Sequence, residues 1–208
     1  MRTILPLLFG TAAVLGTVSA APVPKDAGKP VLYYPTEIGT KIEYKDETET
    51  TTSRAGEIVS AETTDGVTTI TLEWGQASKQ DGAHVVKEKV AVSAKGVFRV
   101  SLDGTELMPP MCLLKLPVKK GDKWDTTFTS GGTKSVGSAT AGEPEEVKTP
   151  AGKFTAVPVE HEYTIGKVTQ RMTHWYAPQV GLVQESFVGY KRNDKKLIVL
   201  KTLQLPKP

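Results

Sequence analysis

The sequence contains one cysteine in 208 residues, so no disulfide can form within one chain and the fold must depend on its core. Long hydrophobic runs are absent after the first twenty residues, which argues against a multi-span membrane protein. Neither sign of charge dominates, because 26 Lys and Arg stand against 23 Asp and Glu. A dedicated nucleic-acid-binding protein would carry a basic excess. The composition therefore indicates an ordinary globular protein with no nucleic-acid partner.

Familiar catalytic motifs are missing as well. The chain has no Gly-x-Ser-x-Gly elbow, no His-Glu-x-x-His and no Gly-x-x-x-x-Gly-Lys, and its Gly-rich stretch 130–142 fits no dinucleotide fingerprint. We therefore expect a protein that is not an enzyme and that uses no cofactor.

The first twenty residues have the layout of a secretory signal peptide. Arg2 precedes an uncharged stretch from Ile4 to Val18, and small residues end this stretch at Ala20. No cysteine stands at the expected cleavage site, which disfavours a lipoprotein anchor. We expect a signal peptide over 1–20, a flexible leader over 21–30 and a single β-rich domain over 31–208. The protein would be periplasmic or secreted, with no transmembrane segment after cleavage.

From residue 31 onward the dominant period of the pattern is two, in runs rich in Thr and Val that Gly-containing turns separate. This pattern predicts an all-β, mainly antiparallel fold of on the order of ten strands. A curved meander sheet that closes to a half-barrel or barrel, with at most short helices, is the expected architecture. The strand around 197–200 is apolar on both faces, which predicts an interior position in the sheet.

Turn residues predict the register of several hairpins. A turn at 65–66 pairs Val59 with Leu72 and Ala61 with Ile70, which places Ile58 on the polar face. A three-residue loop at 94–96 and a turn about 193–194 predict two more hairpins. Their predicted pairs are Val92 with Phe98, Val90 with Val100, Val188 with Val199 and Tyr190 with Leu197.

His161 and His174 form the best candidate for a chemical site. Along 154–176 the residues alternate so that both histidines share a face with Met172 and Tyr176. If the turn is at 166–167, His161 lies diagonal to His174, about 7–8 Å away. If the turn is at 165–166, the two histidines are too far apart.

A metal site would need a third ligand, and Glu160 and Glu162 point to the opposite face. Histidines on an apolar sheet face are usually structural, and we favour that interpretation for this pair.

The segment from Glu106 to Leu116 is too apolar for an ordinary connection. Its prolines exclude a long helix, so we expect a short helix or an apolar loop that either caps the sheet or contacts a ligand. Cys112 within it is interpreted as a buried, inert thiol. The candidate ligand-binding residues are Leu107, Met108, Met111, Leu113, Leu114, Leu116, His161, Met172, His174 and Tyr176.

Three stretches carry a resemblance to a known family: YPTEIGTKIEY at 34–44, VKTPAGKF at 147–154 and WYAPQVGLV at 175–183. Their order and spacing resemble uncharacterised exported bacterial domains (TapB-like) that are associated with the LolA/LolB-like lipoprotein-carrier folds. Ile42 stands where the family usually has an aromatic residue. The resemblance implies a strongly curved sheet that cradles something apolar in an exported protein, and it brings no catalytic residues.

Three hypotheses for function follow. The first is an exported, non-enzymatic β-domain that binds an apolar small molecule, a lipid or an envelope protein on a curved sheet. The second is a structural or assembly component of the cell envelope without a small-molecule ligand. The third is a hydrolase or metalloenzyme that uses His161 and His174.

Overall fold

The computed structural model describes residues 31–48, 53–76, 85–188 and 195–207. These residues form a single sheet of 14 antiparallel strands, and no helix occurs among them. The all-β prediction is confirmed. The predicted signal peptide and leader, the turn at 193–194 and Tyr190 lie outside the described residues.

The described residues contain fourteen strands. In chain order the strands are β1 (Lys41–Asp46), β2 (Ser53–Thr64), β3 (Val67–Gln76), β4 (Val85–Ser93), β5 (Gly96–Leu102), β6 (Thr105–Lys115), β7 (Lys123–Asp125), β8 (Phe128–Ser130), β9 (Thr133–Ala141), β10 (Glu145–Thr149), β11 (Gly152–Ile165), β12 (Val168–Ala177), β13 (Gly181–Val188) and β14 (Lys195–Gln204).

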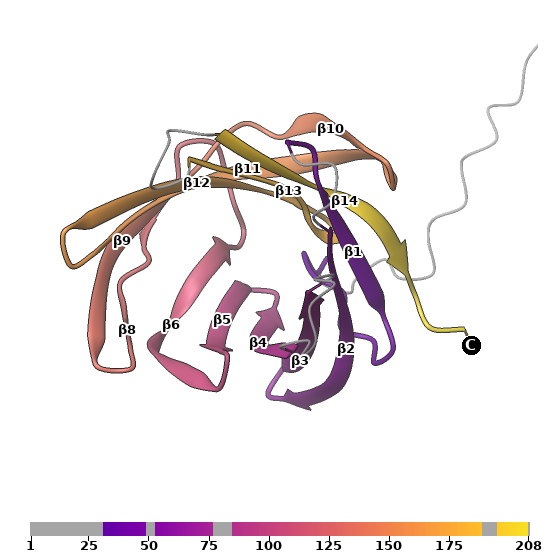
Figure 1. The fold of residues 1–208 in the computed structure, drawn as a ribbon, viewed down its shortest axis with the longest axis horizontal. Helices are drawn as coiled ribbons and strands as arrows, with labels where there is room; N and C mark the ends of the chain where they lie inside the picture. Colours follow the sequence, from indigo (N-terminus) through magenta and orange to yellow (C-terminus); the bar gives the residue numbers. More distant parts are fainter. Residues whose placement is uncertain (1–30, 49–52, 77–84, 189–194, 208) are drawn as a thin grey trace, which may run out of the picture.

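The sheet closes on itself as a 12-stranded barrel. Pairing runs from β1 through β6 to β8 and β9, crosses from β9 to β11, and returns through β12, β13 and β14 to β1. β10 pairs with β11 outside this ring, and β7 pairs with β9 next to β8. In Figure 1, β11 to β13 lie across the curve formed by β2 to β6, while β1 and β14 close one side and β8 and β9 the other.

The apolar segment 106–116 belongs, as far as Lys115, to a strand, β6, so the expectation of a short helix or loop is wrong. β6 pairs with β5 on both sides of a gap: Glu106 lies opposite Ser101, and Met111 lies opposite Arg99. Pro109 falls in this gap, where a residue without an N–H loses no ladder hydrogen bond. A proline that excludes a helix is therefore compatible with an interrupted strand.

The hairpin of β2 and β3 follows the predicted turn at 65–66 but departs from its register farther along. Ala61 pairs with Ile70 as predicted, whereas a bulge at Val59 brings Ile58 opposite Leu72. Ile58 is 0% exposed and Val59 is 41% exposed. The predicted pairing of Val59 with Leu72 is wrong because one extra residue in a strand reverses the faces beyond it.

The predicted register of β4 and β5 is also wrong. The loop has two residues, 94–95, so that Val92 pairs with Val97 rather than with Phe98. Gly96 has a φ of 142°, and a Cβ at this position would lie 2.1 Å from the carbonyl oxygen of Leu114. The glycine is therefore needed for the close approach of β6, not for a third loop residue.

β14 lies between β13 and β1, as its apolar character predicts, but its predicted register is wrong. Val188 pairs with Lys195, and Val199 pairs with Gln184 on β13 and with Lys45 on β1. An interior strand forms hydrogen bonds with two neighbouring strands, so the turn that joins it to one of them does not fix its register.

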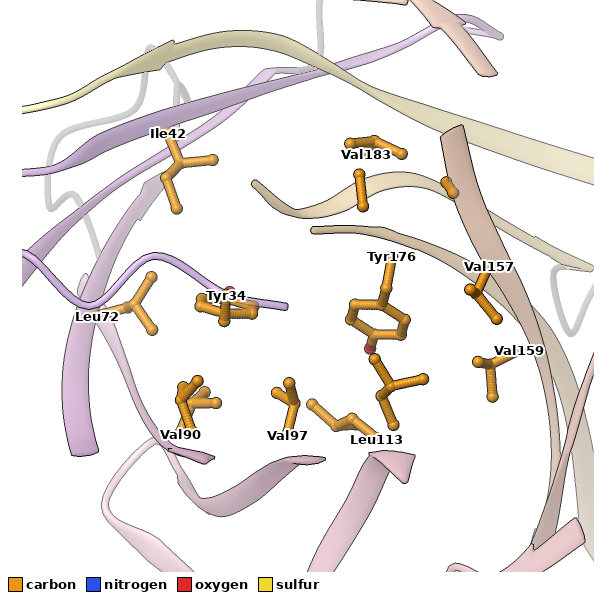
Figure 2. Packing of buried hydrophobic residues seen from close by; sticks show 14 of the residues in the cluster. Tyr34, Ile42, Leu72, Val90, Val97, Leu113, Val157, Val159, Tyr176 and Val183 are labelled. Atoms are coloured by element: carbon orange, nitrogen blue, oxygen red, sulfur yellow. The ribbon is translucent and has the colours of Figure 1, made fainter. Parts of the chain in front are cut away.

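One end of the barrel interior is packed with apolar side chains around Tyr34. Tyr34 is 7% exposed, and the N–H of Gln179 donates to the carbonyl oxygen of Leu32 at 2.7 Å, which holds this segment. Figure 2 shows the Tyr34 ring among side chains from several walls. Those labelled around it are Ile42, Leu72, Val90, Val97, Leu113, Val157, Val159, Tyr176 and Val183. The segment that precedes β1 thus plugs the barrel at this end.

Candidate functional site

The other end of the interior is hollow and holds a cavity of about 520 Å³. Leu102, Ser130 and Ile165 line it, and each lies next to the turn that ends its strand. A smaller cavity of about 30 Å³ lies deeper and shares part of the lining. The barrel is therefore a cup that is packed at one end and open at the other.

The side chains of the cavity wall form layers, because every second residue of a strand points inward. Along β12, Met172, His174 and Tyr176 lie at successively deeper levels. Along β4, Val86 is followed inward by Glu88.

We call the outer layer the apolar entrance: Val86, Leu102, Leu107, Met111, Phe128, Ile165 and Met172. We call the inner layer the charged layer: Arg54, Glu88, Arg99, His174 and Glu185, which line both cavities.

Glu88 and Arg99 bind each other within the charged layer. Arg99 Nε donates to Glu88 Oε1 at 2.6 Å, and Trp74 Nε1 donates to Glu88 Oε2 at 2.8 Å. Burial alone would raise the pKa of Glu88, but the Arg99 guanidinium and these hydrogen bonds hold that pKa below its usual value. Glu88 is therefore an ionised carboxylate with both oxygens occupied.

Arg54 lies beside this pair and is held by aromatic rings. Its guanidinium carbon is 4.7 Å from the centroid of the Trp74 ring and 5.0 Å from that of the Tyr44 ring. Its Nε is buried and has no hydrogen-bond partner among the described residues. Arg54 is therefore held in the cavity wall by cation–π contacts, and its positive charge acts to lower the pKa values of the nearby Glu88 and Glu185.

His174 and Glu185 contact each other in the cavity wall, and burial disfavours the charged form of each side chain. His174 Nε2 is 3.7 Å from Glu185 Oε2, and Tyr176 Oη is 3.4 Å from His174 Nδ1. Burial, with the Arg99 and Arg54 charges, lowers the pKa of His174 to about 3. Burial also raises the pKa of Glu185, against the opposing effect of the two arginines. The pair is a contact between a neutral imidazole and a carboxyl group whose pKa lies above its usual value.

His161 lies next to His174, as the turn at 166–167 predicts. That turn forms, His161 pairs with Met172, and the two imidazole centroids are 5.0 Å apart. His161 is fully buried, and neither ring nitrogen makes a hydrogen bond within the described part of the chain. Burial, then His174 and Arg99, hold its pKa well below the usual value.

Glu160 and Glu162 are exposed, as the alternation predicts. No group of three His, Cys, Asp or Glu side chains that could hold a metal occurs in the residues that the structure describes.

The predicted ligand-binding residues fall into three groups. Those that line the large cavity are Leu107, Met111, Met172 and His174. Leu113 and Tyr176 line the smaller cavity. Leu114 and His161 are fully buried and Leu116 partly so, whereas Met108 points outward and is 64% exposed. Cys112 is only partly buried, and desolvation raises its pKa to about 11, which disfavours a reactive thiolate.

The charged layer apart from His174 was not found from the sequence. One signal was present: Glu88 interrupts an apolar alternation between Val86 and Val90, so a period-two pattern aims a carboxylate inward. Arg54 had no such signal, because its face depends on the bulge at Val59.

The fold and its interior define a class, a closed antiparallel barrel that is plugged at one end and hollow at the other. No protein-family model matches the chain, and no curated protein matches it. Within the described ranges, no helix has the length and apolar character needed to cross a membrane.

Two solved structures are similar in fold. One is a protein from Bacteroides fragilis inferred to be exported, with a YmcC-like fold; identity is 16%, the TM-score 0.61, and the match covers 84% of this chain and 99% of that one. The other is an inferred lipoprotein from Parabacteroides distasonis, at 16% identity and a TM-score of 0.57, covering 85% of this chain and 100% of that one. The likeness is to a YmcC-like barrel, and both the TapB-like and the lipoprotein-carrier parts of the resemblance stay predictions.

Proposed function

We propose that the protein is an exported binding protein, not an enzyme, that holds an amphipathic small molecule inside its barrel. The observation that carries this proposal is the cavity of about 520 Å³ with an apolar entrance above a charged layer. Ligand pockets generally have volumes of about 300–1,000 Å³, mostly apolar walls and a few placed polar groups. The cavity has each of these features.

Export is supported from two sides. The first twenty residues have the layout of a signal peptide. The two similar structures are of an inferred exported protein and an inferred lipoprotein. An extracytoplasmic lipid or other apolar metabolite is the class of ligand that such a protein would meet.

A binding role is favoured over catalysis by the state of the candidate groups. His174, with a pKa of about 3, is a weak base at neutral pH, and His161 is held neutral beside it. Glu88 is fully engaged with Arg99 and Trp74. We therefore rank a hydrolase or metalloenzyme below a binding protein.

An assembly role through a sheet edge is also ranked lower. The last strand at one end of the sheet order is β10, and its exposed side chains include Glu145, Glu146 and Lys148. Charged edge strands discourage pairing with another chain. The cavity offers a more specific means of recognition than this edge.

The test uses the neutral fluorophore N-phenyl-1-naphthylamine, whose emission rises in apolar surroundings. We expect the wild-type protein to bind it, and Val86→Trp, which fills the entrance, to bind it about tenfold more weakly. Val136→Trp is the matched control, because Val136 lies on the outer surface and is 56% exposed. A wild-type protein that binds no probe, or a Val86→Trp variant that binds as well as the control, would contradict the proposal.

A further inference from the structure

Arg54 is the charged group of the cavity that lacks an ionic partner among the described residues. Glu88 is occupied by Arg99, whereas Arg54 contacts two aromatic faces and has no carboxylate within salt-bridge distance in the part of the chain that the structure describes. A buried guanidinium N–H without an acceptor is costly, and such groups usually have a partner in the functional state. Because Arg54 lines the large cavity, its guanidinium faces the space in which a ligand with an acceptor group would lie.

The two rings that hold Arg54 are themselves fixed. Tyr44 Oη donates to the carbonyl oxygen of Leu182 at 2.9 Å, and Trp74 Nε1 donates to Glu88 at 2.8 Å. Arg54 is thus held in position by aromatic rings and not by a carboxylate. A receptor built in this way loses less conformational entropy when its ligand binds.

The neighbouring carboxyl groups limit the charge of that ligand. Glu88 is ionised, and Glu185 lines the same cavity. A dianion would be repelled by the Glu88 carboxylate, whereas a single negative charge can be balanced by Arg54. Glu185, whose pKa is raised by burial, can donate a hydrogen bond to such an anion when protonated.

We propose that the cavity binds a monocarboxylate amphiphile with its headgroup inward, the carboxylate accepting from Arg54 and the hydrocarbon chain lying along the apolar entrance. This inference rests on the proposed function and names its ligand class. A carboxylate is planar and has two acceptor oxygens, which match the two-pronged guanidinium better than a point charge would. The chain would then contact Val86, Leu102 and Phe128.

The test compares dodecanoate with dodecanol, which has the same chain length and no charge, by isothermal titration calorimetry. We expect dodecanoate to bind about 10- to 100-fold more tightly, because a hydrogen bond to a charged group is stronger than a neutral one. Arg54→Gln should remove this preference while dodecanol still binds, and Arg54→Lys should retain part of it. Arg171→Gln is the control, because Arg171 is exposed on the outer wall, where it pairs with Glu162.

The outcomes separate this inference from the proposed function. Equal binding of dodecanoate and dodecanol, or a preference that survives Arg54→Gln, overturns the monocarboxylate inference and leaves cavity binding intact. Tighter binding of dodecyl phosphate than of dodecanoate also overturns it. Binding of neither ligand, nor of the neutral fluorophore, overturns both.

A measurement on the wild-type protein does not depend on the stability of the variants. Dodecanoate is labelled with carbon-13 at the carboxyl group, and the NMR chemical shift of the bound ligand reports whether its headgroup is ionised. A carboxylate at Arg54 should stay ionised at a pH where the free acid is already protonated. A bound carboxyl that titrates like the free acid overturns the inward orientation.

Discussion

At the scale of single residues, the protonation state of each buried group follows from its neighbours. Glu88 is ionised because Arg99 and Trp74 occupy it, whereas His161 and His174 are neutral because burial and nearby positive charge oppose a further charge. The cost of keeping a histidine neutral is small at pH 7 and grows in acid. Acid stability is therefore the property that should report on these rings.

We predict that His161→Leu makes the protein more resistant to acid. The folded pKa of His161 lies below the usual value of 6.5, so the unfolded chain binds its proton first, and stability falls as pH falls below 6.5. Between pH 7 and 5 the wild type should lose about 2 kcal/mol more than the variant in free energy of unfolding.

Urea unfolding at pH 7 and pH 5 measures this difference. Asp46 and Glu88, whose pKa values are lowered, and Glu185, whose pKa is raised, also respond to pH, but they are present in both proteins. Equal losses in the two proteins would show that His161 is protonated in the folded state.

At the scale of elements, one bulged residue decides what faces the cavity. An unbroken alternation back from Ala61 would put Ile58 and Arg54 on the outer surface. The bulge at Val59 reverses the faces, so that Ile58 enters the core and Arg54 lines the cavity. The turn at 65–66 could be predicted from Asp-Gly chemistry, but the bulge could not, because it depends on the fit of β2 to both β1 and β3.

A pair of alanine substitutions tests the bulge. Ile58→Ala should destabilise the fold by about 2–4 kcal/mol, because it leaves a cavity in the core. Val59→Ala should change the free energy of unfolding by about 0.5 kcal/mol or less, as is usual for an exposed site. Urea unfolding at neutral pH measures both. If Val59→Ala were the more destabilising substitution, the bulge would be absent, the alternation of β2 would be unbroken, and Arg54 would face outward.

The hairpin of β11 and β12 shows where sequence was sufficient. The turn at 166–167, one of the two that the sequence allowed, sets a regular register from Ile165 to Val157, so the approach of His161 to His174 follows from residue spacing once that turn is fixed. β6 shows the limit, because its prolines exclude a helix yet lie in a gap of the pairing with β5. Registers were predictable where one turn governs one regular pair, and were not where bulges or second neighbours intervene.

At the scale of the whole molecule, the period-two pattern was sufficient for an all-β closed sheet but not for the division of its interior. Apolar residues face inward at both ends of the barrel, and only one end is filled. The difference arises from Tyr34, which enters from outside the strands, and from the charged layer, in which the Arg99 and Arg54 charges act on His174, far away in sequence. Tyr34 has no local periodic signature, and within the charged layer that sequence reasoning missed, Glu88 alone has one.

This division predicts that the two ends of the barrel respond differently to the loss of an aromatic ring. Tyr34→Ala should cost about 3–5 kcal/mol, because the side chain is only 7% exposed. Phe128→Ala should cost about 1–2 kcal/mol, because Phe128 is partly buried and already borders the open cavity.

Binding should follow the opposite order. Phe128→Ala removes part of the apolar entrance and should weaken dodecanol binding, whereas folded Tyr34→Ala protein should bind nearly as well as the wild type. Urea unfolding and calorimetry on the same samples measure both properties. If Tyr34→Ala abolished binding at a temperature where the variant is folded, the plug would belong to the binding site, and the packed end of the barrel would not be separate from the hollow end.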